Sequence, residues 1–252
     1  MDSSSHRRQN DWCEGSVSTS NVLFYNNIVP LNRDQHRDFH VDTGVNRFGY
    51  ARGSHVIPAL VDEFVAAGIN LPILFTVGAP DLVPVFLVGL RTNVNALVDE
   101  TGNWNGDYIP AFVRRYPFII GEVPGSEPLA CIDETAAIQS NTSARMFEED
   151  GKETPALIER IQFANEYFRA ADRNAGFVKM LTELGLFRTV SIDVKLASGE
   201  ALSIQGFMTV DADKLQNLSD EDFGKLRAAG YLAPIYAHLA SLGCVERIRR
   251  VS

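Results

Sequence analysis

A change in hydrophobic period in the second half of the chain most constrains the fold. Over residues 155–172 apolar side chains recur at steps of 4, 3, 4 and 3, the spacing of an amphipathic helix. Over residues 190–210 they alternate with polar side chains, the period of a strand that has one wet face. The Ser198-Gly199 pair interrupts this alternation and predicts a turn. The sequence therefore indicates a β-hairpin that follows a helix.

Helix signals surround this hairpin. Thr154 supplies a capping hydroxyl, and Pro155 has a fixed φ that suits a first helical turn. A second helix is expected over residues 177–184, before the hairpin. Short helices are expected to close the chain, the last of them starting at Pro234. The C-terminal part is thus predicted as an amphipathic hairpin followed by short helices.

Short apolar runs in the first half predict strands with one helix among them. Residues 47–51, 71–77 and 83–90 are typical of strands, and the last is apolar throughout, which predicts burial on both faces. Pro58 and Gly68 indicate the start and the end of a helix between the first two runs. Because helices and strands mix without a regular βαβ rhythm, the predicted fold class is α+β, with a mixed or antiparallel sheet.

The chain shows no internal repeat and no linker rich in Pro, Gly or Ser. We therefore predict a single domain over residues 22–252, with an internal joint near the acidic segment 147–155. Residues 1–21 are polar and serine-rich, a composition that predicts a disordered tail. Either Met1 or Val17 could be the native first residue, and the hypothesis of Val17 depends on the more natural beginning of the sequence that follows it.

Composition limits the partners and the compartment. Lys and Arg number 23 and Asp and Glu number 32, a net charge of −9, so the chain lacks the basic footprint of nucleic-acid binding. Its longest apolar run, residues 83–90, is far shorter than the ~20 residues of a membrane span. No apolar region typical of a secretory signal follows the basic residues of the N-terminus. An odd number of cysteines, 3, without CxxC spacing favours a reducing compartment. We expect a cytoplasmic protein that neither binds nucleic acid nor enters a membrane.

The stretch "YIPAFVRRYPF", residues 108–118, places Arg114 and Arg115 between two prolines and among four aromatic rings. Pro110 can open a helix of about two turns, in which Arg115 would lie beside Phe112 and Tyr116. An extended segment would instead put Arg114 between the same two rings. Either geometry lays a guanidinium against aromatic surface, where a further anion would stabilise it.

Two roles for this guanidinium stay open. It could pair with a carboxylate of the chain, such as Asp99, Glu100 or Asp107, or it could anchor the carboxylate or phosphate of a ligand. His238 borders the apolar face of the last predicted helix, and it could be a half-buried histidine bonded to a backbone carbonyl or part of a site. The candidate ligand-binding residues are Arg114, Arg115, Tyr108, Tyr116, Trp104 and His238.

The stretch "DQHRDFHVD", residues 34–42, is the candidate metal site. His36 and His40 are four residues apart and would share a face of a helix, whereas a strand would line them up with Asp38. Imidazole and carboxylate ligands suit Zn or Fe(II). The stretch lacks the glutamate that follows the first histidine in the metalloprotease motif, and a surface histidine pair is the alternative. We therefore expect no cofactor, with Fe or Zn as the alternative.

Motifs of common enzymes and nucleotide-binding proteins are absent. The chain has no GxSxG, no GxxxxGK[ST] and no GxGxxG, which lowers the odds of the common hydrolase, kinase and dehydrogenase classes.

Landmarks along the whole chain resemble those of one family. In order they are "VPLNRDQHRDFHV", "FGYAR", "LPILFTV", "GNWNGDYIPAFVRRYPF", "CIDE", "MFEEDGKETP" and "YAHLASL". Together they resemble the SapC family, proteins associated with bacterial surface layers, from about Val22 to the C-terminus. The matching motif residues are His36, Trp104, Gly106, Tyr108, Pro110, Arg114, Arg115, Tyr116, Pro117, Phe118, Asp133 and His238. Leu71 departs from the tyrosine expected at its position.

The resemblance implies a context rather than a reaction. Some relatives look like neighbours of outer-membrane uptake receptors and of oxygenase or halogenase genes, which implies an accessory role, and no catalytic residues can be carried over. The first hypothesis is a cytoplasmic accessory protein that binds a peptide, a protein or a small acidic ligand, and that could form a homodimer. The second is a metal-dependent, oxygenase-like enzyme that uses His36 and His40. A third treats the arginine motif as a folding nucleus.

Overall fold

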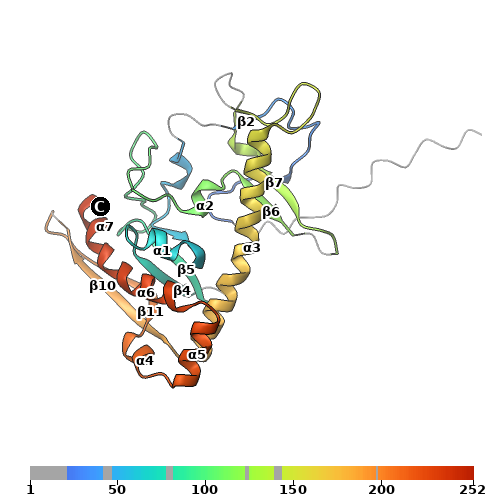
Figure 1. The fold of residues 1–252 in the computed structure, drawn as a ribbon. Coiled ribbons are helices and arrows are strands. Elements are labelled where there is room, and N and C mark those ends of the chain that lie inside the picture. Colours follow the sequence, from blue (N-terminus) through green and yellow to red (C-terminus); the bar gives the residue numbers. More distant parts are fainter. Residues whose placement is uncertain (1–21, 42–46, 78–81, 123–124, 139–143, 197) are drawn as a thin grey trace, which may run out of the picture.

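The structure is a computed structural model that describes residues 22–41, 47–77, 82–122, 125–138, 144–196 and 198–252 (Figure 1). The predicted tail 1–21 and Val17 lie outside the described residues. Helices and antiparallel strands mix along the chain, which confirms the α+β class.

The strands are β1 (Ile28–Pro30), β2 (His40–Val41), β3 (Val56–Pro58), β4 (Ile73–Val77), β5 (Leu82–Leu87), β6 (Phe118–Gly121), β7 (Leu129–Asp133), β8 (Ala137–Ile138), β9 (Ala144–Arg145), β10 (Phe187–Lys195) and β11 (Ala201–Val210). The helices are α1 (Phe64–Ala67), α2 (Ala111–Arg114), α3 (Pro155–Glu183), α4 (Ala212–Gln216), α5 (Asp220–Ala228), α6 (Leu232–Ser241) and α7 (Val245–Val251), with short 3-10 helices at Gly49–Ala51, Val61–Glu63, Glu134–Ala136 and Leu242–Cys244.

The largest sheet has the order β10-β11-β4-β5-β3, and all of its pairs are antiparallel. The predicted hairpin is confirmed as β10 and β11, with an irregularity in register between Val190 and Ile192. At its turn Gly199 has a φ of +89°, a left-handed conformation that glycine adopts without strain. Two further sheets, β1-β7-β6 and the short-stranded β8-β2-β9, lie outside this one.

Helix α3 begins where the sequence predicts. The Thr154 side chain accepts a hydrogen bond of 3.2 Å from the backbone N–H of Leu157, the geometry of an N-cap. The two predicted helices are wrong as separate elements, because α3 runs unbroken for 29 residues. Gly176 lies within this helix, and a Cβ there would lie 2.9 Å from the Tyr231 hydroxyl. This glycine therefore serves the close approach of Tyr231 to the helix.

Several local predictions for the first half are corrected. Residues 47–51 contain a 3-10 turn rather than a strand, and Pro58 ends β3 rather than starting a helix. The helical turns start after Leu60, because the Glu63 carboxylate reaches back and accepts a 3.1 Å hydrogen bond from the Leu60 N–H. The predicted strands at 71–77 and 83–90 are confirmed in essence as β4 and β5.

Two hydrophobic clusters make up the core of the described residues, and α3 contributes to both. Its first turns place Leu157 and Ala164 against β6 and β7, whereas Phe177 and Leu181 belong to the larger cluster around β4. The helix thus runs from the β1-β7-β6 sheet to the C-terminal helices (Figure 1). The prediction of one domain over residues 22–252, with a joint near 147–155, stays a prediction.

Among the described residues no single helix has the length and apolar composition of a membrane span. The bent pair formed by α5 and residues 232–251 meets that test together by length and composition alone, with an angle of 94° at its break.

Candidate functional site

The two adjacent arginines point to different surroundings. Arg115 is buried, with 8% of its surface exposed. Its guanidinium carbon lies 4.3 Å from the ring centroid of Phe112, 4.2 Å from that of Tyr167 and 5.6 Å from that of Tyr25. Its Nε has no hydrogen-bond partner within the part of the chain that the structure describes. Arg115 is therefore a cation held by aromatic faces inside the protein, an arrangement that favours a structural role over direct contact with a ligand.

Tyrosine rings continue this aromatic cluster. The rings of Tyr50 and Tyr116 stack with centroids 4.0 Å apart, and Tyr25 meets Tyr116 edge-on at 5.2 Å. The hydroxyl of Tyr25 donates to the Phe118 carbonyl at 2.8 Å. Burial raises the pKa of both Tyr25 and Tyr50, so these hydroxyls stay protonated hydrogen-bond donors. The cluster, with the candidate residue Tyr116 inside it, ties the start of the described chain to the arginine motif.

Asp133 is a buried carboxylate that contacts the aromatic cluster through Tyr116. It is fully buried and accepts hydrogen bonds from the backbone N–H groups of Asn26, Asn27 and Thr135 at 2.9, 3.1 and 3.1 Å. The Tyr116 hydroxyl donates to the same carboxylate at 3.2 Å. Burial by itself would raise the pKa of Asp133, but these hydrogen bonds together bring it below the usual value. The carboxylate is thus an internal anchor of the fold.

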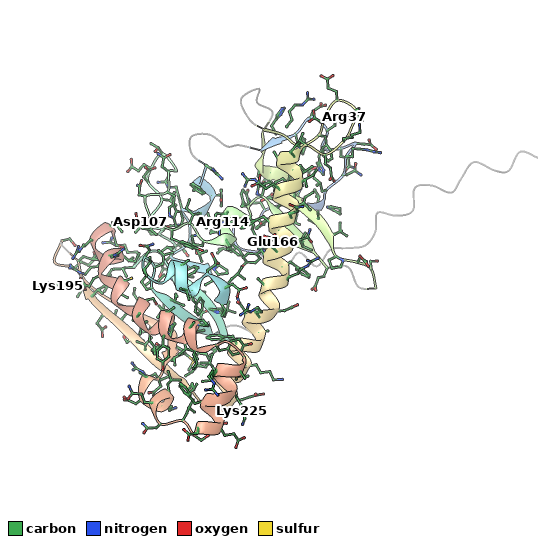
Figure 2. All side chains as sticks on the ribbon, in the orientation of Figure 1. Arg37, Asp107, Arg114, Glu166, Lys195 and Lys225 are labelled. Atoms are coloured by element: carbon green, nitrogen blue, oxygen red, sulfur yellow. The ribbon has the colours of Figure 1, made fainter. Side chains whose placement is uncertain are left out.

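Arg114 is exposed and lies at the end of α2, next to α3 (Figure 2). Its Nε donates to the carbonyl of Ile109 at 3.0 Å, and its guanidinium carbon lies 4.9 Å from the ring centroid of Phe163. Among the described residues neither Arg114 nor Arg115 forms an ion pair. The predicted pairing with Asp99, Glu100 or Asp107 is therefore wrong.

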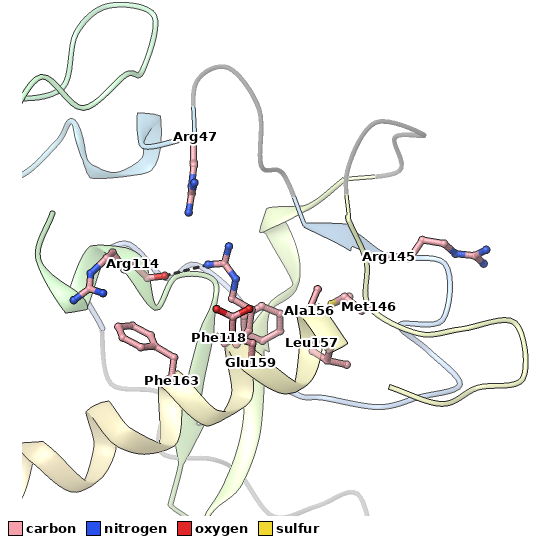
Figure 3. A pocket seen from close by; sticks show the side chains of 10 residues that line it. Arg47, Arg114, Phe118, Arg145, Met146, Ala156, Leu157, Glu159 and Phe163 are labelled. Carbon is pink, nitrogen blue, oxygen red and sulfur yellow. Dashed lines mark hydrogen bonds between the residues drawn. The ribbon is translucent and has the colours of Figure 1, made fainter. Parts of the chain in front are cut away.

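Arg114 instead lines a cavity of about 290 Å³ beside the start of α3 (Figure 3). The exposed side chains at its rim include Arg47, Arg145 and Glu159, while buried Phe118 and Leu157 lie at its base. Its described lining residues are Arg47, Arg114, Phe118, Arg145, Met146, Ala156, Leu157, Glu159, Arg160 and Phe163. Cationic groups thus surround a partly apolar hollow.

Positive charge exceeds negative charge in this cavity, although the chain is acidic overall. Arg160 donates from Nη1 to the carbonyl of Arg114 at 3.3 Å, the bond drawn dashed in Figure 3. Burial, and then the nearby charge of Arg47, lower the pKa of the Arg160 guanidinium. Arg145 lies 3.9 Å from Glu149 on the exposed surface, and Figure 3 shows it directed away from Arg47 and Arg114. An anion placed among Arg47, Arg114 and Arg160 would relieve their mutual repulsion.

Tyr108 and Trp104 do not line this cavity. The Tyr108 hydroxyl donates to Glu63 Oε1 at 2.9 Å, and the backbone N–H of Ala111 donates to the same oxygen at 2.7 Å. Trp104 donates from its indole nitrogen to the Tyr108 carbonyl at 3.0 Å. Burial raises the pKa of Glu63, although these hydrogen bonds oppose the rise. The structure thus places Trp104 and Tyr108 in a bonded network around a buried carboxylate, apart from the cavity.

His238 is fully buried between α6 and the large sheet. Its Nε2 accepts a hydrogen bond of 3.0 Å from the Val210 N–H, which leaves Nδ1 to donate to the Ile73 carbonyl at 2.9 Å. The Thr209 hydroxyl lies 2.9 Å from the same Nε2. All of its polar atoms are used inside the protein, so His238 crosslinks β4, β11 and α6. These contacts favour the alternative of a structural histidine bonded to a backbone carbonyl, and contact with a ligand stays a prediction.

This crosslink predicts a loss of stability in mild acid. Burial lowers the pKa of His238 from 6.5 to about 4. Because the unfolded chain binds this proton first, the free energy of unfolding decreases as the pH falls from 6.5 to 4, by about 3 kcal/mol from this residue. Urea denaturation at stepped pH values measures the slope. The His238→Gln variant is expected to be less stable at pH 7 but to lose this part of the slope, and an unchanged slope would contradict the assignment.

The three candidate metal ligands lie in different local structures. Residues 33–38 make turns, so His36 and His40 share neither a helix nor a strand. His36 is fully buried and accepts at Nδ1 from the Asn32 N–H at 2.9 Å, whereas Asp38 is exposed. His40 belongs to β2. Within the described ranges no group of three or more His, Cys, Asp or Glu side chains is placed to hold a metal ion. Asp42 of the same stretch lies outside the described residues, and the Fe or Zn alternative stays a prediction.

Sequence reasoning found Arg114 but missed Arg47, Arg145 and Arg160. Arg160 lies one turn after the helix start that the sequence predicts, next to Ile161 of its apolar stripe, which is the one available signal that it borders the core. Arg47 and Arg145 come from segments far away in sequence, and no local pattern connects them with Arg114.

These features define an α+β protein whose candidate site is an arginine-lined cavity. The sequence model of the SapC family matches residues 31–248, and the chain therefore belongs to the SapC family. This match confirms the resemblance noted from the sequence landmarks. Comparisons with curated proteins and with solved structures found no match.

Proposed function

We propose that this SapC-family protein binds a small acidic ligand in the arginine-lined cavity and acts as an accessory protein rather than as a catalyst. The observation that carries the proposal is the gathering of four arginines around one cavity in a chain with a net charge of −9. Concentrating positive charge in one cavity does not by itself stabilise an acidic protein. A bound anion would compensate this charge.

The chemistry of the lining favours a carboxylate or phosphate group. Guanidinium groups donate two parallel hydrogen bonds to such anions. Arg114 and Arg160 are partly fixed before any ligand arrives, Arg114 by its bond to Ile109 and its contact with Phe163, and Arg160 by its bond to the Arg114 carbonyl. Side chains that are already ordered lose less entropy when they bind.

The biological context comes from the family resemblance and is part of the proposal. A role in a bacterial surface layer or in outer-membrane uptake fits a protein that holds an acidic small molecule before or after another step. The free thiols of Cys131 and Cys244 support a reducing compartment such as the cytoplasm. The expectations that the protein binds no nucleic acid, does not enter a membrane and could form a homodimer stay predictions.

Thermal unfolding with acidic probes tests the proposal. Inorganic phosphate, sulfate, benzoate and phenyl phosphate, each at millimolar concentration, are compared with chloride at equal ionic strength. At least one probe is expected to raise the Tm of the protein, because a ligand that binds only the folded state stabilises it. The Arg47→Gln/Arg160→Gln double variant is expected to lose this rise.

Arg188→Gln is the matched control, because Arg188 is an exposed arginine on β10 that does not line the cavity. It is expected to keep the full rise in Tm. If no acidic probe raises the Tm of the unaltered protein, or if both variants lose the rise equally, the cavity is not an anion site and the proposal fails.

A further inference from the structure

The cavity has two chemically different parts, and this division narrows the class of ligand. Arg47, Arg114 and Arg160 supply cationic groups to its lining, whereas the buried side chains of Phe118 and Leu157 supply its apolar base. The volume of about 290 Å³ is at the lower limit of small-molecule pockets, which start at about 300 Å³. A bare inorganic anion would leave the apolar walls facing empty space or water.

We propose that the ligand is a phosphomonoester of a compact apolar group, with its phosphate among the three arginines and its apolar body against the base of the cavity. This inference rests on the proposed function and specifies its ligand. The apolar walls supply the burial of carbon surface, and the guanidinium groups supply the charge-assisted hydrogen bonds.

The charge of the head group follows from the number of arginines. A phosphomonoester carries about −1.5 to −2 charges at pH 7 and has three acceptor oxygens, whereas a carboxylate carries one charge and two oxygens. Burial, and then the charge of Arg47, lower the pKa of Arg160, while the charge of Glu159 opposes this change. Arg160 also donates a hydrogen bond to the backbone carbonyl of Arg114. Together with the lining carboxylate of Glu159, the three arginines carry a net charge of +2, which matches a doubly charged head group better than a single carboxylate.

Ala156 offers a position at which the size of the cavity can be changed. It lines the cavity from the first turn of α3, and its side chain is exposed rather than packed in the core (Figure 3). An Ala156→Leu change therefore places a larger side chain in the cavity and reduces its free volume, without disturbing a buried contact. It should exclude an apolar body while leaving room for a free phosphate ion.

Calorimetric titration with four probes tests this inference: phenyl phosphate, inorganic phosphate, benzoate and phenol. We expect phenyl phosphate to bind at least tenfold more tightly than inorganic phosphate or benzoate, and phenol not to bind. Ala156→Leu is expected to weaken phenyl phosphate at least tenfold and to change inorganic phosphate less than twofold. Ala171→Leu, a change at an exposed alanine further along the same helix and outside the cavity, is expected to change neither.

The outcomes separate this inference from the proposed function. If inorganic phosphate binds as tightly as phenyl phosphate, the apolar base is not used and the inference is overturned, although the cavity remains an anion site. If benzoate binds more tightly than phenyl phosphate, the head group is a carboxylate and the phosphomonoester assignment is overturned. If Ala156→Leu weakens both phosphates equally, the apolar body does not lie where the structure assigns it.

Discussion

Replacing Arg115 with alanine is expected to lower the free energy of unfolding by about 3 kcal/mol, whereas the same change at Arg114 costs less than about 1 kcal/mol. Arg115 is 8% exposed, and its guanidinium carbon lies within 4.3 Å of the ring centroids of both Phe112 and Tyr167. Alanine removes these cation–π contacts and leaves a hole in the aromatic cluster. Arg114 is exposed, and water replaces most of what it loses.

Urea denaturation of both variants at pH 7 measures the difference. Because a typical domain is stable by about 5–15 kcal/mol, a loss of this size at Arg115 shifts the midpoint clearly. The two variants together also separate the two roles of the motif. Arg115→Ala is expected to unfold more readily, and Arg114→Ala is expected to stay stable but to bind acidic probes more weakly.

Arg115→Met distinguishes the charge from the packing. Methionine keeps most of the aliphatic stem and is expected to recover part of the loss, since long side chains also stabilise through their carbon atoms. If Arg115→Met were more stable than the unaltered protein, the burial of the unpaired guanidinium would cost more than its contacts with the rings contribute. That result would contradict the stabilising role assigned to Arg115.

Replacing Asp133 with alanine is expected to cost about 3 kcal/mol, because it leaves several donors without an acceptor. The N–H groups of Asn26, Asn27 and Thr135 and the hydroxyl of Tyr116 all donate to this one buried carboxylate. The change therefore loosens the attachment of the first described segment to β7. Chemical denaturation at pH 7 measures the loss.

Asp150→Ala is the matched control, because Asp150 is an exposed aspartate in a turn that accepts hydrogen bonds from Lys152. It is expected to change the free energy of unfolding far less than Asp133→Ala does. The pH dependence supplies a second readout, since the folded pKa of Asp133 is lowered despite its burial. Its contribution is present above the unfolded pKa and is lost as the pH falls through the folded value. The Asp133→Asn variant should lack this acid-dependent loss, and equal acid slopes for the two proteins would argue against the network.

Elements with a strong local signal were predictable from the sequence. The β10–β11 hairpin carries a period of two and a glycine turn, and the start of α3 carries a capping threonine followed by a proline. Predictions failed where a contact far away in sequence decides the outcome. The sequence predicted two helices over residues 155–184, but in the fold they are one, and Gly176 within it makes room for Tyr231. The role of His238 was unpredictable for the same reason. Its three hydrogen-bond partners belong to β4 and β11, and no local sequence pattern indicates that these strands contact α6.

The candidate site divides in the same way. The motif around Arg114 and Arg115 could be recognised in the linear chain, because two arginines among four aromatic rings are rare in any context. The sequence could not show which of the two arginines is buried. The burial of Arg115 depends on Tyr167 of α3, about 50 residues further along the chain. The cavity itself exists only in the folded molecule, where segments near residues 47, 114, 145 and 160 meet. The arginines line one cavity because the packing of the segments that bear them stabilises the fold. This packing outweighs the repulsion between their charges.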